Sequence, residues 1–152
     1  MATFGSLKTA FVDGARVLDV RDQNEIDAGK GGKCVSNAVR VPMNMNGESQ
    51  VTHQTTIEEY AAALTAAGVD LNNPSTFVVH CTGGGRANKA CEFLEKLGFT
   101  ALNGGSPAVV TKCYEEAEFL KVLRNLRAVP VFKRKPTLFK FAVTSSVKPG
   151  EL

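Results

Sequence analysis

One short stretch of this chain combines residue types that could do chemistry, and it reads His80-Cys81-Thr82-Gly83-Gly84-Gly85-Arg86-Ala87. Because glycine lacks a Cβ atom, three in succession allow a sharply bent backbone or the close approach of a ligand. A turn that runs from a strand into a helix directs amide N–H groups inward, and the helix adds the positive end of its dipole. We therefore expect residues 81–86, called the glycine loop below, to bind an anion.

Cys81 stands at the start of the glycine loop, where a positive field favours the thiolate form of a cysteine. Arg86, five positions later, could close the loop with a planar cation. A thiolate held in this way suits two chemistries, because it can accept a sulfane sulfur as a persulfide or attack phosphorus. Attack on phosphorus requires a wider ring of backbone amide groups, since a phosphoryl group has three equatorial oxygens.

The elements that must position this loop are short apolar strands that alternate with amphipathic helices. This alternation is typical of an α/β domain with a mostly parallel sheet. We expect strands at 17–20, 39–41, 77–79 and 100–102. The glycine loop then follows the third of these strands and precedes a helix.

Three helices are expected from their end signals. One begins at a Thr55–Glu58 capping box and stops at Gly68, and a second runs from Ala87 to Leu97. The third begins at Pro107, extends to about residue 127 and places five residues on its apolar face: Val109, Cys113, Ala117, Leu120 and Leu123.

Length and composition favour one globular domain. The chain has 152 residues, of which 43% are hydrophobic and 22% charged, and this excludes a disordered chain, a collagen-like fibre and a coiled coil. No apolar run is long enough for a membrane span, and the first residues lack the pattern of a secretory signal. We therefore expect a cytoplasmic protein.

The net charge of +3 is unevenly distributed, because residues from 131 onward carry +4 and the first 130 carry −1. We expect a domain over 1–128 and a basic extension over 129–152, with strands at 129–132 and 137–143 around a basic turn. A basic run of this kind is most often solvated, so nucleic acid binding is not expected. The four cysteines lack paired spacing, and we expect free thiols with no bound metal.

Five motifs, in order, resemble those of the rhodanese superfamily. The loop has four residues between Cys81 and Arg86, as in rhodaneses, whereas the related phosphatases and arsenate reductases have five. The other matching segments are 17–21 with Glu25-Ile26, 38–42, 97–99 and 102–105. Lys33-Cys34-Val35-Ser36-Asn37 stands where the family has Gly-His-Ile-x-Gly. The resemblance covers about residues 4–126 and implies a three-layer fold with a five-stranded, mostly parallel sheet flanked by helices.

The resemblance implies a sulfurtransferase that needs no cofactor and uses Cys81 as its catalytic nucleophile. Thiosulfate, mercaptopyruvate or a persulfide would donate sulfur, and a thiol, cyanide or a protein would accept it. The resulting persulfide would be held by the rest of the glycine loop, namely Thr82, Gly83, Gly84, Gly85 and Arg86. Two alternatives remain open: a phosphatase or arsenate reductase of the same fold, and a non-catalytic binding module.

The remaining polar and sulfur residues are assigned supporting roles or none. Asp19 and Arg21 are expected to form an ion pair that supports the loop. His80 should point to the opposite face of its strand from Cys81, as a satisfied histidine. Cys91 and Cys113 are expected in the core, whereas Cys34, in a Gly-Lys-rich loop, could be exposed and take part in sulfur relay.

Overall fold

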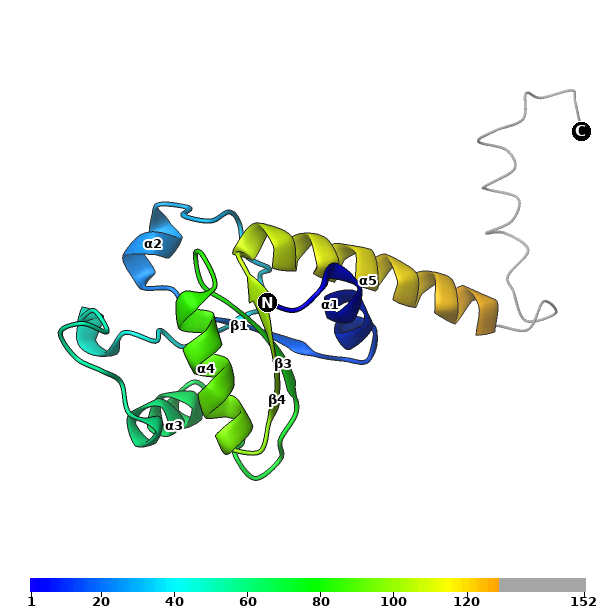
Figure 1. Cartoon of the computed structure of the whole chain (residues 1–152). Helices are drawn as coiled ribbons and strands as arrows, with labels where there is room; N and C mark the ends of the chain where they lie inside the picture. Colours follow the sequence, from blue (N-terminus) through cyan, green and yellow to red (C-terminus); the bar gives the residue numbers. More distant parts are fainter. Residues whose placement is uncertain (129–152) are drawn as a thin grey trace, which may run out of the picture. The chain divides into compact units, whose positions relative to one another are not determined.

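A sheet of four parallel strands lies between two layers of helices (Figure 1). This computed structural model describes residues 1–128, and residues 1–119 form one compact unit. The strand order in the sheet is β2-β1-β3-β4. The strands are β1 (Arg16–Asp19), β2 (Val39–Arg40), β3 (Thr76–His80) and β4 (Thr100–Gly105). The expected α/β class and helix-flanked parallel sheet are confirmed.

Helices cover both faces of this sheet. Buried side chains of α3 and α4 pack on one face, and those of α1 and the first part of α5 pack on the other. Residues of α5 beyond 119 belong to a second unit. The helices are α1 (Phe4–Val12), α2 (Gln23–Asp27), the 3-10 helix η1 (Met45–Gly47), α3 (Ile57–Ala66), α4 (Gly85–Lys96) and α5 (Pro107–Ala128).

Strand β3 shows how the sequence builds these two cores. Its side chains alternate, so Phe77 and Val79 join the core beneath α3 and α4, whereas Val78 joins the core beneath α1 and α5. Every residue from Phe77 to His80 is buried. A strand that is buried on both faces has apolar residues at consecutive positions. This explains why β3 could be predicted from the sequence.

The strand order reverses between β1 and β3. The chain passes from β1 outward to β2, returns across β1 to β3, and continues to β4. In open α/β sheets, ligands bind outside the carboxyl ends of the strands at such a switch point. Asp19 ends β1 and His80 ends β3, so the residues that follow them, the glycine loop included, lie at this switch point.

The expectation of a fifth strand is wrong for the residues that the structure describes, where the sheet has four. Near the N-terminus, the Ala2 N–H donates one hydrogen bond to the Asn103 carbonyl in β4. Thr3 then caps α1, and its side chain accepts from the Ser6 N–H. The chain therefore turns into a helix before a ladder of hydrogen bonds can form.

The helix α3 uses a different capping box from the expected one. Thr56 and Glu59 form the reciprocal pair of hydrogen bonds, whereas Thr55 is buried and its hydroxyl donates to the Met43 carbonyl. Both Thr-x-x-Glu frames occur in the sequence. Burial of Thr55 selects the second frame, because its hydroxyl needs an internal partner.

Other boundaries also differ from expectation. The fourth strand, expected to end at residue 102, continues through residues 103–105 as part of β4, and the short α1 and α2 had no strong sequence signal. In α5 the buried residues are Pro107, Val110, Cys113 and Ala117. The predicted stripe is therefore wrong at Val109 and Leu120, both of which are exposed.

The strands expected at 129–132 and 137–143 lie outside the described residues, as does the basic extension. Within residues 1–128, no helix combines the length and hydropathy that crossing a bilayer demands.

Candidate active site

The Sγ of Cys81 accepts a hydrogen bond of 2.9 Å from the backbone N–H of Gly84. Cys81 follows β3 directly, and its own N–H donates to the Gly105 carbonyl at 3.2 Å. The side chain is 2% exposed, so the sulfur lies inside the fold with an amide N–H directed at it. A donor in this position stabilises a sulfur anion more than a neutral thiol.

Backbone geometry explains the glycine at position 84. Its φ of +98° lies in the left-handed region, which a residue with a Cβ atom adopts only at a cost in free energy. Gly84 is also the N-cap of α4, so the unpaired N–H groups of the first helical turn begin at the glycine loop. The turn and the helix therefore bring positive backbone groups to the sulfur.

Asn103 of β4 holds this turn in place. Its Nδ2 donates to the Gly84 carbonyl at 2.9 Å, and its Oδ1 accepts from the Gly105 N–H at 2.9 Å. One side chain thus joins the end of β4 to the residue whose amide contacts Cys81. Asn103 is not among the site residues that the sequence analysis predicts.

The other two glycines of the loop occupy less restricted positions. A Cβ atom added to Gly83 or Gly85 would meet no heavy atom within 4 Å. Gly83 lines a cavity of about 190 Å³, together with Gly105 and Ser106. The bend that we expected from three glycines is therefore concentrated at Gly84, and open space lies beside Gly83.

Arg86 binds Glu25 rather than the sulfur of Cys81. Its guanidinium donates to the two carboxylate oxygens of Glu25 at 2.6 and 2.7 Å, and the Thr82 hydroxyl donates to the same carboxylate at 2.9 Å. Hydrogen bonding to Arg86 lowers the pKa of Glu25 to about 2. Glu25 thus ties both ends of the glycine loop to the segment after β1 and offsets the positive charge of Arg86.

Asp19 and Arg21 form the expected ion pair, deep in the protein. Arg21 is 1% exposed, and its Nη2 lies 2.7 Å from Oδ2 of Asp19. Its Nη1 donates to the carbonyls of Lys30 and Gly32, at 2.8 and 3.3 Å. The pair therefore braces the turn at 30–32 directly. Gly31, in this turn, lies close to the glycine loop, since an added Cβ would meet the Thr82 backbone at 3.3 Å.

The four cysteines are free thiols. Cys91 and Cys113 are buried, as expected, and burial raises the pKa of Cys91 to about 12. Cys34 is partly exposed and lies 3.2 Å from Nε2 of His80. Sequence reasoning missed this contact, because the two residues are 46 positions apart and no local pattern links them.

Asp19, Cys34 and His80 are the only cluster of three potential metal ligands found within residues 1–128. The donor set fits a cation poorly, because the Asp19 carboxylate already accepts hydrogen bonds from the Arg21 side chain on both oxygens. An adjacent guanidinium opposes the binding of a second cation. These three side chains instead lie in a line, with the His80 ring between the Cys34 thiol and the Asp19 carboxylate.

The fold and the site together define an α/β domain in which a cysteine-bearing loop joins a central strand to the N-terminus of a helix. Residues 3–112 match the rhodanese-like domain family, and this stretch is more than half of the chain. The chain belongs to the rhodanese-like domain family, as the resemblance of its motifs implied.

Comparison with solved structures gives two similar proteins. A rhodanese-like domain protein from Staphylococcus aureus is 20% identical, with a TM-score of 0.42, and the match covers 73% of this chain and 86% of that one. The protein SSP1007 from Staphylococcus saprophyticus is 22% identical, with a TM-score of 0.41 and a match over 69% and 85% of the two chains. No curated protein matches the chain.

Proposed function

We propose that this protein is a sulfurtransferase that carries a sulfane sulfur as a persulfide on Cys81. The Cys81 thiolate attacks the outer sulfur of a donor, and a new S–S bond forms. The donor's own bond to that sulfur breaks, and the electron pair leaves with the remainder, as sulfite from thiosulfate or as a thiolate from a persulfide. An acceptor thiol, cyanide or a protein nucleophile then attacks the outer sulfur and releases the Cys81 thiolate.

The hydrogen bond from the Gly84 N–H to the Cys81 Sγ is the observation that carries this proposal. It supplies a fixed donor for a sulfur anion at the N-terminus of α4, and membership of the rhodanese-like domain family is consistent with it. The four-residue spacing between Cys81 and Arg86 favours sulfur transfer over phosphoryl transfer, because a longer loop would be needed to surround a phosphoryl group.

Access to the sulfur requires a movement of the glycine loop, because the Cys81 side chain is 2% exposed. The open space beside Gly83 gives the loop room to shift. The Glu25 carboxylate lies beside the loop and pairs with Arg86. Its negative charge disfavours the approach of a donor that carries two negative charges. A persulfide is therefore the better donor, and thiosulfate the weaker one.

Mass spectrometry of the full chain tests the proposal directly. The protein is incubated separately with glutathione persulfide, 3-mercaptopyruvate and thiosulfate, and then digested with trypsin after the thiols are blocked. Cleavage after Arg40 and Arg86 isolates Cys81 from the other three cysteines. We expect a gain of about 32 Da, one sulfur atom, on this peptide, and no such gain when cyanide is added before the thiols are blocked, because cyanide removes the outer sulfur as thiocyanate.

The Cys81→Ser variant is the matched control, and it should gain no sulfur on this peptide. If no donor adds sulfur to Cys81 in the wild-type chain, the sulfurtransferase proposal fails. Hydrolysis of an aryl phosphate that is lost in Cys81→Ser would instead support a phosphatase. Retention of the cellular role in Cys81→Ser would support a non-catalytic binding module.

A further inference from the structure

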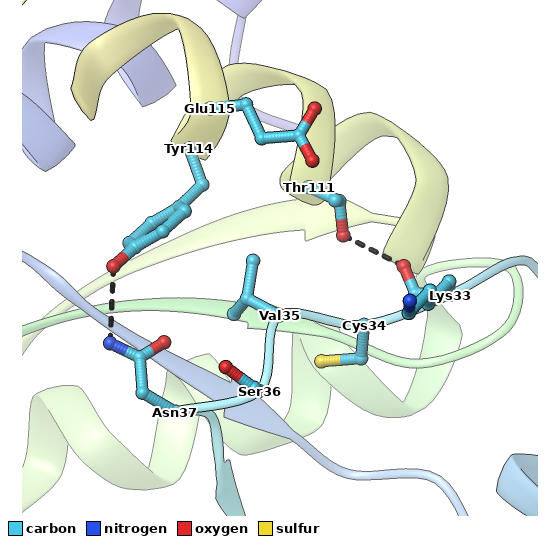
Figure 2. Close-up of a pocket in the computed structure, with 8 residues that line it drawn as sticks. All are labelled: Lys33, Cys34, Val35, Ser36, Asn37, Thr111, Tyr114 and Glu115. Atoms are coloured by element: carbon cyan, nitrogen blue, oxygen red, sulfur yellow. Dashed lines mark hydrogen bonds between the residues drawn. The ribbon is translucent and has the colours of Figure 1, made fainter. Parts of the chain in front are cut away.

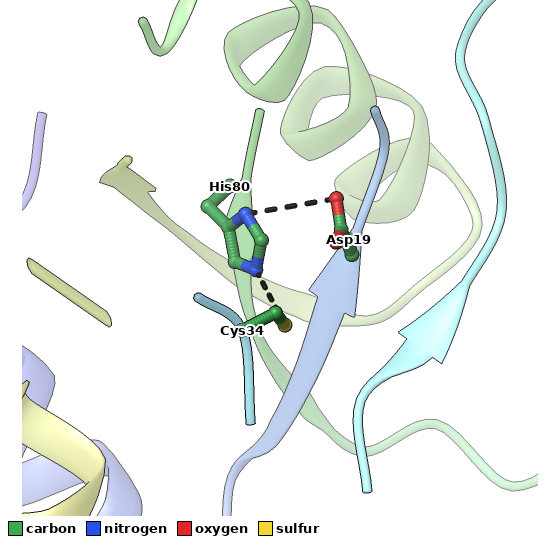
Figure 3. A group of neighbouring side chains, drawn as sticks. All are labelled: Asp19, Cys34 and His80. Carbon is green, nitrogen blue, oxygen red and sulfur yellow. Dashed lines mark hydrogen bonds and ion pairs between the residues drawn. The ribbon is translucent and has the colours of Figure 1, made fainter. Parts of the chain in front are cut away.

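Cys34, His80 and Asp19 form a line of three interacting side chains (Figure 3). The Sγ of Cys34 lies 3.2 Å from Nε2 of His80, and Nδ1 of the same ring lies 3.7 Å from Oδ1 of Asp19. His80 and Asp19 are fully buried, whereas Cys34 is partly exposed. The order thiol, imidazole, carboxylate is the one used by cysteine nucleophiles whose proton passes to a histidine held by a third group.

This cluster lies on the opposite face of the sheet from Cys81. Cys81 packs in the core beneath α3 and α4. Cys34 packs against the core beneath α1 and α5, and His80 is directed to this side because side chains alternate along β3. The face expected for His80 is therefore correct, but its Nδ1 has no hydrogen-bond partner. The cluster is thus a feature separate from the Cys81 site.

Cys34 is one of the residues that line a cavity of about 430 Å³ (Figure 2). The cavity lies between the segment at 33–37 and α5, and two hydrogen bonds hold its walls together. Thr111 donates to the Lys33 carbonyl at 2.7 Å, and Asn37 donates to the Tyr114 hydroxyl at 3.1 Å. Lys33 and Glu115 add one charge of each sign to the lining, which suits a small molecule that carries both charges.

We propose that Cys34 is a second nucleophilic thiol, with His80 as its base and Asp19 as the residue that positions the imidazole, and that it undergoes exchange with the disulfide of a small amino acid-type molecule in this cavity. The inference stands independently of the proposed role of Cys81. The unpartnered, fully buried Nδ1 of His80 supports it, since an N–H at that position faces the Asp19 carboxylate and leaves Nε2 free to accept the thiol proton.

The exchange balances without any further oxidant. Nε2 of His80 takes the proton of the Cys34 thiol as Sγ attacks one sulfur of the disulfide. The Cys34–S bond forms, the original S–S bond breaks, and its electron pair goes to the departing sulfur. His80 then returns the proton to that thiolate. The products are a mixed disulfide on Cys34 and one small thiol.

The charges around the cluster make its pH dependence distinctive. Asp19 and Arg21 lie beside His80, and Asp19, Arg21 and Arg40 act on Cys34. Burial is the largest influence on both groups: it lowers the pKa of His80 to about 4 and raises the pKa of the Cys34 thiol to about 11. A neutral thiol beside a neutral imidazole therefore persists across the physiological range. A base-assisted reaction should have a flat rate there, whereas attack by free thiolate rises tenfold per pH unit.

Peptide mapping can follow Cys34 alone in the full chain. Trypsin cleaves after Lys33 and Arg40, so Cys34 leaves on a peptide that contains no other cysteine. The protein is treated with cystine between about pH 5 and 9, and the fraction of this peptide carrying half-cystine is measured over time. We expect mixed-disulfide formation at Cys34 at a rate that is nearly constant across this range in the folded chain, whereas in the chain unfolded by guanidinium the rate should rise with pH.

Two variants test whether His80 is the base that takes the proton of Cys34. His80→Gln retains a polar side chain that cannot take the proton, and it should slow cystine exchange at Cys34 at about pH 6 by at least tenfold. His53→Gln changes a partly exposed histidine that pairs with Glu59, and it should leave the rate unchanged. The rate at Cys34 in both variants is compared with the rate at Cys34 of the wild-type chain under the same conditions.

Three results would overturn the proposal: no reaction at Cys34, a rate that rises tenfold per pH unit in the wild-type chain, or an unchanged rate in a folded His80→Gln variant. The pH profile of the wild-type protein decides the matter if His80→Gln does not fold. If Zn²⁺ slows the exchange, a chelator restores the rate and one ion binds per folded chain, the cluster is a metal site and the nucleophilic proposal is wrong.

Discussion

Arg86 donates two hydrogen bonds, of 2.6 and 2.7 Å, to the carboxylate of Glu25. The glycine loop therefore presents less positive charge to an anionic reagent than its own residues would suggest. In Glu25→Gln, iodoacetate should alkylate Cys81 three- to tenfold faster relative to neutral iodoacetamide, a change of about 1 kcal/mol for the loss of one nearby negative charge. The ratio of the two rate constants is the measurement, because both reagents attack the same sulfur.

Glu58→Gln provides the matched control for this experiment. Glu58 is an exposed acid in the first turn of α3, and its removal changes the net charge of the protein by the same amount. The ratio of rates at Cys81 should remain as in the wild-type chain. An equal change in both variants would show that overall charge, rather than the Glu25–Arg86 pair, governs approach to the sulfur.

The same pair makes the stability of the fold sensitive to acid. Hydrogen bonding to Arg86 holds the pKa of Glu25 at about 2, below the ordinary range of glutamate. The folded state therefore binds the proton less readily than the unfolded chain. The resulting stabilisation, about 2 kcal/mol, is present in full above the unfolded pKa and is lost as the pH falls from about 4.5 toward 2.

Urea denaturation of the wild-type chain and Glu25→Gln at several pH values tests this linkage. The wild-type protein should be more stable by about 2 kcal/mol at neutral pH, and the difference should shrink toward zero near pH 2. A difference that stays constant over the whole range would mean that the ionisation of Glu25 contributes nothing to the stability of the fold.

Gly84 and Gly85 are neighbours, but substitution by alanine should have opposite effects on the free energy of unfolding at the two positions. Gly84 has a φ of +98°, and an added Cβ would also lie 3.5 Å from the Gly105 Cα. Gly84→Ala should therefore lower the free energy of unfolding by about 1–2 kcal/mol. Gly85 begins α4 and has open space around its Cα, so Gly85→Ala should leave stability unchanged or raise it by up to about 1 kcal/mol.

Sulfur uptake distinguishes the two variants further, since only Gly84→Ala should displace the N–H that contacts the Cys81 Sγ. The measurement is the rate at which glutathione persulfide adds sulfur to the Cys81 peptide. If Gly84→Ala were as stable and as reactive as Gly85→Ala, the left-handed turn would not be what directs this amide.

Local patterns predicted the elements around the site well. The run Phe77-Val78-Val79, preceded by a turn containing Pro74, indicates a buried strand because β-branched and aromatic residues favour that environment. Gly98, which follows α4, has a φ of +92°, as expected of a residue that ends a helix. Such features depend on neighbouring residues, and the sequence displays them directly.

The contacts that complete the site are long-range, and no local pattern displays them. Glu25 precedes its partner Arg86 by 61 positions, and Asn103 follows Gly84 by 19. Both contacts depend on how β1, β3 and β4 come together at one edge of the sheet. Sequence analysis could therefore predict the glycine loop and its cysteine, but not the carboxylate that pairs with Arg86 or the amide that locks the turn.

The Arg21 guanidinium binds partners on two sides at once, and this requires its planar shape. Its guanidinium contacts Asp19 through Nε and Nη2 and the carbonyls of Lys30 and Gly32 through Nη1. A lysine ammonium cannot reach both partners, since its three donors share one nitrogen. Arg21→Lys should therefore lower the free energy of unfolding by about 2–3 kcal/mol, measured by urea denaturation.

Limited proteolysis reports whether this loss is local to the turn at 30–32. Trypsin should cut after Lys30 and Lys33 several-fold faster in folded Arg21→Lys, because the turn loses two hydrogen bonds from Nη1. Arg40→Lys, at an exposed position, should change stability by less than about 0.5 kcal/mol and leave these cuts unchanged. If Arg21→Lys behaved like Arg40→Lys in both measurements, the buried ion pair would not be what holds the turn against Thr82.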